Sequence, residues 1–85
     1  MSKIRVAVCE DIDSIRQHFV DLISSRNDME IVGVARNGEE IKDVALKEKP
    51  DIILMDIQME TEKAGIDATK DLSGQLPDTS IIIIT

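Results

Sequence analysis

Aromatic side chains are almost absent from this sequence of 85 residues, in which Phe19 is the only Phe, Tyr or Trp. A hydrophobic core must therefore be built from aliphatic side chains. At this length, folding buries only about 60–65% of the surface that the unfolded chain exposes, so we expect one small domain of marginal stability. The composition, 42% hydrophobic and 32% charged, is that of an ordinary globular protein.

Positive charge and cysteine are also scarce. The 10 Lys and Arg residues are outnumbered by 17 Asp and Glu residues, and the net charge of −7 argues against nucleic-acid binding, which requires a basic surface. The sequence has no apolar run of membrane-spanning length and no signal peptide, so we expect no membrane contact and a cytoplasmic location. The single cysteine, Cys9, cannot form an internal disulfide, and its apolar neighbours are typical of a buried, unreactive thiol.

The hydrophobic residues that are present fall into four short runs, which predict strands over residues 4–9, 29–35, 52–55 and 80–85. Three segments with helical periodicity separate these runs, between residues 13 and 25, 39 and 49, and 65 and 76. Asp13 or Ser14 can cap the first helix. This alternation predicts an α/β fold, a doubly wound parallel sheet with right-handed crossovers, in which the first helix covers one face and the other two helices cover the opposite face.

The first helical segment has a clear apolar periodicity. Hydrophobic residues recur at positions i, i+4, i+7 and i+8, and they predict a stripe that faces the sheet, formed by Ile15, Phe19, Leu22 and Ile23. The opposite face of this helix is polar and is formed by Arg16, Gln17, Asp21 and Ser24.

Acidic residues come directly after two of the predicted strands. Glu10 and Asp11 follow the first strand and Asp56 follows the third, although Asp56 taken alone could equally cap a helix or a turn. Neighbouring strands lie about 4.8 Å apart and parallel strands end at the same edge, so adjacent first and third strands would bring three carboxylates together. Mg²⁺ would relieve their mutual repulsion. The Thr85 hydroxyl, at the end of the fourth strand, would lie at the same edge.

These residues resemble the receiver domain of bacterial two-component response regulators. The resemblance rests on Glu10 and Asp11 after the first strand, on Asp56 in the segment LMDIQM, and on Thr85 in the segment IIIIT. It implies a flavodoxin-like sheet with strand order 2-1-3-4, in which Asp56 accepts a phosphoryl group from a sensor histidine kinase. It also implies that Glu10, Asp11, Asp56 and the backbone carbonyl of Gln58 hold Mg²⁺, and that Thr85 is the switch hydroxyl.

The sequence departs from the family pattern in two ways. Glu60 stands where the family usually has proline, and Gly65 lies one residue later than the family's glycine. Family domains also continue after the fourth strand with a helix, a fifth strand that ends in a phosphate-binding lysine, and a final helix. We therefore expect residues 1–85 to be a truncated receiver domain that is phosphorylated weakly by itself. Residues 29–40 also resemble receivers that precede a helix-turn-helix DNA-binding output domain.

Three alternatives can be weighed against this interpretation. The segment from Asp11 to Ser14 resembles the DxD motif of haloacid dehalogenase phosphatases, in which Asp11 would carry the phosphoryl group and Asp56 would have no role. A flavin or nucleotide binder requires a loop rich in Gly, Ser or Thr after the first strand, where this sequence is acidic. The third alternative is a non-catalytic fragment that keeps only the scaffold and the metal site.

The last predicted strand suggests how the chain could associate. The run from Ile81 to Ile84 is uncharged and contains no proline. At the edge of a sheet, such a run is a template for pairing with another strand. We therefore expect a homodimer or a larger assembly formed through this strand.

Overall fold

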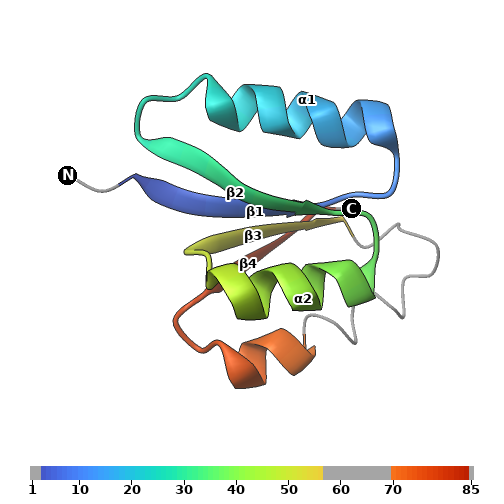
Figure 1. The fold of residues 1–85 in the computed structure, drawn as a ribbon, viewed down its shortest axis with the longest axis vertical. Coiled ribbons are helices and arrows are strands. Elements are labelled where there is room, and N and C mark those ends of the chain that lie inside the picture. The colour runs from blue at the N-terminus through green and yellow to red at the C-terminus, as the bar shows by residue number, and fades with distance from the viewer. Residues whose placement is uncertain (1–2, 57–69, 85) are drawn as a thin grey trace.

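The computed structural model describes residues 3–56 and 70–84, which form a parallel sheet with helices on both faces (Figure 1). The strands are β1 (Ile4–Cys9), β2 (Met29–Ala35), β3 (Ile52–Asp56) and β4 (Ser80–Ile84), in the order β2-β1-β3-β4. The predicted α/β fold and strand order are therefore confirmed. Four residues singled out in the sequence lie outside the described residues: Gln58, Glu60, Gly65 and Thr85.

The helices lie on the predicted faces of the sheet. α1 (Asp13–Ser24) covers one face, while α2 (Gly38–Glu48) and the helical residues 70–75 cover the other (Figure 1). Residues 70–75 are the described part of the third predicted helix. Of the helices that the structure describes, none is long and apolar enough to span a membrane.

The two complete helices begin differently. The Asn37 side chain caps α2 by accepting a hydrogen bond of 2.9 Å from the Glu40 backbone N–H. For α1, the predicted cap at Asp13 or Ser14 is wrong, because Ile12 occupies the N-cap position and no side chain caps the helix. Asp13 lies instead in the first helical turn, where its carboxylate pairs with Arg16.

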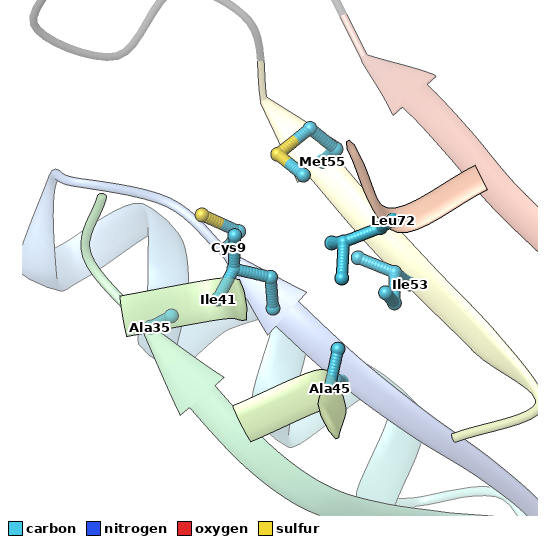
Figure 2. Packing of buried hydrophobic residues seen from close by; sticks show 8 residues of the cluster. Cys9, Ala35, Ile41, Ala45, Ile53, Met55 and Leu72 are labelled. Carbon is cyan, nitrogen blue, oxygen red and sulfur yellow. The ribbon is translucent and has the colours of Figure 1, made fainter. Parts of the chain in front are cut away.

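The hydrophobic core lies between the sheet and α2. Its buried side chains come from three strands, from α2 and from the segment 70–75, and they are Ala7, Cys9, Ala35, Ile41, Ala45, Ile53, Met55 and Leu72 (Figure 2). These side chains are aliphatic or contain sulfur, as the shortage of aromatic residues predicts. Phe19, the only large aromatic residue, lies on α1 and is half-buried.

The predicted apolar stripe of α1 is only partly covered, and this helix contains no buried residue. Phe19 and Ile23 are half-buried against the sheet, but Ile15 is 40% exposed and Leu22 is 54% exposed. The prediction that all four stripe residues face inward is therefore wrong for these two. The physical reason is that, among the described residues, α1 has no neighbouring helix on its face of the sheet, so the flanks of its stripe remain partly exposed.

A close contact joins β2 to α2. The pairing of β1 with β2 shifts by one residue, because Val6 pairs with Ile31 while Ala7 pairs with Gly33. Gly33 faces Val44 of α2, and a Cβ added at Gly33 would overlap the Val44 side chain. A helical valine has one strongly preferred rotamer, so Val44 cannot easily move aside. The close approach of β2 and α2 therefore requires glycine at position 33.

Replacing Gly33 by alanine should consequently destabilise the fold by about 1–3 kcal/mol through overpacking. In a double-mutant cycle measured by urea unfolding, Val44→Ala should remove most of that additional cost. Gly74→Ala is the matched control, because no atom lies within 4 Å of a Cβ at this helical position. The Gly74→Ala substitution should increase the free energy of unfolding by up to about 1 kcal/mol. Equal effects at the two glycines would contradict the close contact.

Candidate functional site

Three carboxylates meet at the edge where β1 and β3 end. Cys9 pairs with Met55, so the next residues along the chain, Glu10 and Asp56, leave neighbouring strands side by side. One carboxylate oxygen from each of Glu10, Asp11 and Asp56 lies within 4.8 Å of the other two. The convergence expected from the sequence is therefore present. The roles predicted for Gln58 and Thr85 fall outside the described residues and stay predictions.

Glu10 is a buried carboxylate with an incomplete set of partners. Its side chain is fully buried, and its Oε1 accepts a hydrogen bond of 3.2 Å from the Ile12 backbone N–H. Its Oε2 is buried and has no hydrogen-bond partner within the part of the chain that the structure describes. Buried polar atoms are nearly always paired in native proteins. This oxygen therefore requires a proton, a cation or a water molecule as its partner.

The environment of Glu10 favours its protonated form. Burial, contact with the Asp56 carboxyl group and the negative charge of Asp11 together raise the pKa of Glu10 to about 7, although the Ile12 N–H acts in the opposite direction. Two carboxylates both accept hydrogen bonds, so Glu10 and Asp56 can bond to each other only when one carries a proton. A hard divalent cation such as Mg²⁺, which prefers carboxylate oxygens, would satisfy the same groups without the proton.

Cys9, directly before the acidic residues, is a buried free cysteine. It is 1% exposed, and its thiol donates a weak hydrogen bond of 3.5 Å to the Asn37 backbone carbonyl. Burial, reinforced by the negative charge of Glu10, raises the pKa of the Cys9 thiol to about 12. The reactive thiolate is therefore not formed at neutral pH. The prediction that Cys9 is a buried residue is confirmed.

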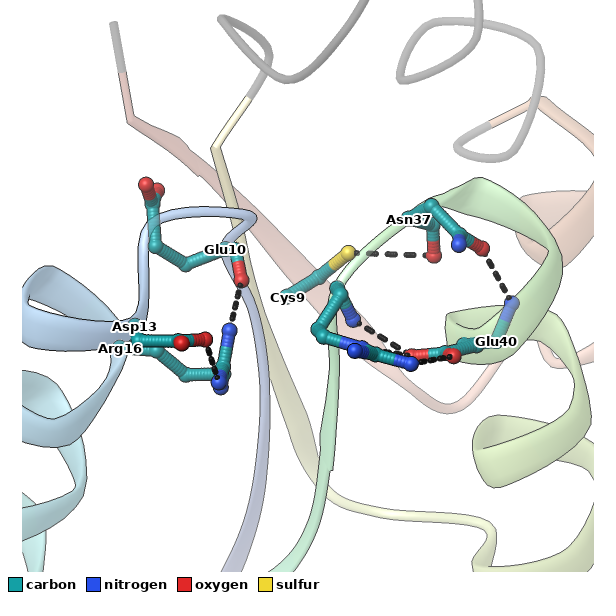
Figure 3. Close-up of polar contacts among 7 residues, drawn as sticks. Cys9, Glu10, Asp13, Arg16, Asn37 and Glu40 are labelled. Carbon is teal, nitrogen blue, oxygen red and sulfur yellow. Dashed lines mark hydrogen bonds and ion pairs between the residues drawn. The ribbon is translucent and has the colours of Figure 1, made fainter.

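The sequence pattern assigned Arg16 to the polar face of α1, but its side chain is only 17% exposed. Its Nη1 donates a hydrogen bond of 2.9 Å to the Glu10 backbone carbonyl, and its Nη2 pairs with the Asp13 carboxylate (Figure 3). The signal that could have revealed this contact is the i, i+3 spacing of Asp13 and Arg16 directly after an acidic strand end. Arg16 thus belongs to the acidic site, although the sequence patterns did not predict this.

A second arginine lies at the end of β2. Its guanidinium forms an ion pair of 3.2 Å with Glu40, and its backbone N–H donates a hydrogen bond of 2.9 Å to the same carboxylate. This residue, Arg36, is 64% exposed at the side chain, so solvent screens the pair and it contributes little to stability. The two arginines at this edge therefore differ: Arg16 contacts the loop that carries the acidic residues, and Arg36 contacts α2.

Comparison with known proteins identifies the family. The sequence model of the response regulator receiver domain matches residues 6–85, which is nearly the whole chain. This chain belongs to the response regulator receiver domain family. Solved receiver domains share its fold. The response regulator domain of Thermotoga maritima CheB is 38% identical and superposes with a TM-score of 0.85, over 95% of this chain and 59% of that one.

Further relatives are regulators that are longer than this receiver domain. The transcriptional regulatory protein YxjL of Bacillus subtilis is 43% identical over 98% of this chain, which spans 38% of that protein. The oxygen regulatory protein NreC of Staphylococcus aureus is 32% identical over 95% of this chain, which spans 37% of it. A response regulator of the LuxR family from Aurantimonas is 25% identical with a TM-score of 0.86, over 96% of this chain and 58% of that one. The chain is thus the receiver domain of a two-component response regulator.

The raised pKa of Glu10 predicts how stability depends on pH. The folded state holds the Glu10 proton more tightly than the unfolded chain does, so in the absence of metal this residue should lower the free energy of unfolding as pH rises from about 4.5 to about 7. Glu10→Gln should remove that slope. At about pH 8 the variant should be more stable than the native chain by about 1 kcal/mol, after allowance for solvent screening.

Urea unfolding in the presence of a chelator, repeated over this pH range, measures the effect. Glu30→Gln is the matched control, because Glu30 is an exposed strand residue away from the acidic edge. An identical pH dependence in the native chain and in Glu10→Gln would mean that the carboxylates do not interact as described.

Proposed function

We propose that this receiver domain accepts a phosphoryl group on Asp56 in a reaction that depends on Mg²⁺. The observation that carries the proposal is the convergence of Glu10, Asp11 and Asp56, with a buried Glu10 oxygen that lacks a hydrogen-bond partner among the described residues. Carboxylate oxygens in this arrangement fit a hard cation. Asp56 lies at the end of β3 and is only half-buried. Its carboxylate can therefore be reached by an incoming phosphoryl group.

The reaction divides the three carboxylates between two tasks. An Asp56 oxygen attacks phosphorus and forms an acyl phosphate, while the bond between phosphorus and the donor breaks and its electron pair leaves with the donor. Mg²⁺, when bound, supplies positive charge that neutralises the transferring phosphoryl group. Glu10 and Asp11 would hold the cation, with the Gln58 backbone carbonyl completing the protein ligands and the Thr85 hydroxyl responding to the phosphoryl group.

We further propose that the donor is the phosphohistidine of a sensor kinase and that the recipient of the signal is a transcriptional output domain. Relatives named as regulatory proteins support this assignment, and this chain spans only 38% of the length of one of them. The acidic surface of the receiver domain supports an output through another domain, since a net charge of −7 is unsuited to contacting DNA directly.

Incubation of the chain with acetyl phosphate and Mg²⁺ tests the acceptor. We expect a small, Mg²⁺-dependent increase in intact mass by one phosphoryl group, which peptide mapping after borohydride reduction assigns to Asp56. Asp56→Asn should abolish the labelling. Asp51→Asn is the matched control, since Asp51 lies at the opposite end of β3 and should leave it unchanged.

The alternatives give different results in the same experiment. Labelling on Asp11 would favour a haloacid dehalogenase phosphatase. A third outcome combines two results: no labelling is found, yet calorimetry shows Mg²⁺ binding that Asp11→Asn or Asp56→Asn weakens. This outcome would favour a fragment that keeps only the scaffold and the metal site. Equal Mg²⁺ binding by the native chain and both variants would refute the metal site itself.

We also propose that the chain self-associates through β4. In the described residues this strand pairs only with β3, and its exposed side chains include Ile82, 47% exposed, and Ile83, 46% exposed. The strand carries no charged residue or proline that would block pairing of its free edge. A second copy of the same strand, related by a twofold axis, could pair with it in antiparallel orientation.

Light scattering after size exclusion should therefore report a dimer or larger species at tens of micromolar protein, a concentration at which weak association becomes visible. Ile82→Lys should restore the monomer, because a lysine at a strand edge opposes strand addition. Leu22→Lys is the matched control: Leu22 is equally apolar and 54% exposed, but it lies on α1. A monodisperse native monomer, or equal effects of the two lysines, would contradict association through β4.

A further inference from the structure

The loop between β1 and α1 carries two of the three site carboxylates and is held on both sides of Asp11. Before it, the Glu10 backbone N–H donates a hydrogen bond of 3.0 Å to the Ala35 carbonyl of β2. After it, the Ile12 backbone N–H is bound by the Glu10 side chain at 3.2 Å. Asp11 therefore projects from a stretch of backbone whose position depends on hydrogen bonds made by its two neighbours.

The Arg16 side chain joins the loop to the first turn of α1. Its backbone N–H donates a hydrogen bond of 2.9 Å to the Ile12 carbonyl, its Nη1 donates one of 2.9 Å to the Glu10 carbonyl, and its Nη2 pairs with Asp13. Figure 3 shows the Glu10 carboxyl group pointing away from the Arg16 guanidinium, which lies against the Glu10 backbone. Arg16 thus restrains the loop and leaves the Glu10 carboxylate oxygens to the site.

We infer that Arg16 is a positioning residue for the cation site, which fixes the backbone from which Glu10 and Asp11 reach toward Asp56. The inference rests on the proposed function in one respect, namely that the three carboxylates bind Mg²⁺. Groups that orient metal ligands without touching the metal typically change metal affinity by about 10–100-fold when they are removed. The guanidinium of Arg16 satisfies this description, because its contacts are with the Glu10 carbonyl and with Asp13.

Positioning and simple electrostatics predict opposite effects at this residue. Arg16 carries a positive charge close to a cation site, so its loss would tighten Mg²⁺ binding if charge alone mattered. If Arg16 positions the loop, its loss should weaken binding even though a repelling charge has been removed. The sign of the change in affinity therefore separates the two explanations.

Calorimetric titration of the chain with Mg²⁺ measures this sign. Arg16→Gln should bind Mg²⁺ about 10-fold more weakly than the native chain. Arg16→Lys keeps the charge but cannot reach both the Glu10 carbonyl and Asp13 in the same geometry, so it should be weakened by an intermediate factor. Arg36→Gln is the matched control: it removes an equal charge that acts on Asp13, but the Arg36 side chain pairs with Glu40. It should bind Mg²⁺ as tightly as the native chain or slightly more tightly.

A second measurement excludes a general loss of structure. In the metal-free chain, the backbone amide resonances of Asp11 and Ile12 should move in Arg16→Gln, while those of the core strand β3 stay in place. Unchanged or tighter Mg²⁺ binding by Arg16→Gln would overturn the inference. If Arg16→Gln fails to fold, the Mg²⁺ affinity of Arg16→Lys tests the inference instead. An affinity equal to that of the native chain would then overturn the inference. If Asp56→Asn binds Mg²⁺ as tightly as the native chain does, the proposed metal site itself is wrong.

Discussion

The main constraint that this fold has to meet is the convergence of negative charge at the ends of β1 and β3. Three carboxylate oxygens within 4.8 Å of one another repel, and one of the residues, Glu10, is fully buried. Such a cluster can persist only where the surrounding fold holds the chain in place. Parallel pairing of β1 with both neighbours, and the contacts of Arg16 with the loop, supply that support.

The packing of the molecule is correspondingly uneven. The face of the sheet beneath α2 holds the buried core, and Gly33 lets α2 approach β2 closely. The face beneath α1 is less well covered, since α1 contributes no buried residue. Burial of apolar surface is the main stabilising contribution in a small domain, and Val6 and Val8 of β1, outside the cluster that packs on α2, are buried as well. The exposed apolar residues of α1 and β4 remain available for contacts.

Much of this arrangement was predictable from residue patterns. β-branched runs identified the strands, Asn37-Gly38 marked the start of α2, and acidic residues directly after two runs indicated one shared edge. The predictions failed where the outcome depends on neighbours distant in the sequence. The helical period of α1 could not reveal that Leu22 would be exposed, and a polar position in a helix gave no sign that Arg16 would turn back toward Glu10.

The division between sequence and structure has a physical reason. Local periodicity and turn residues determine which segments become strands and helices, because these preferences act between residues a few positions apart. The sequence by itself therefore determined the alternation of elements and the acidic residues at the strand ends. Only the tertiary structure decided that Glu10 is fully buried, that one of its oxygens lacks a partner among the described residues, and that Arg16 holds the loop, since burial and hydrogen bonding depend on packing between elements remote in the chain.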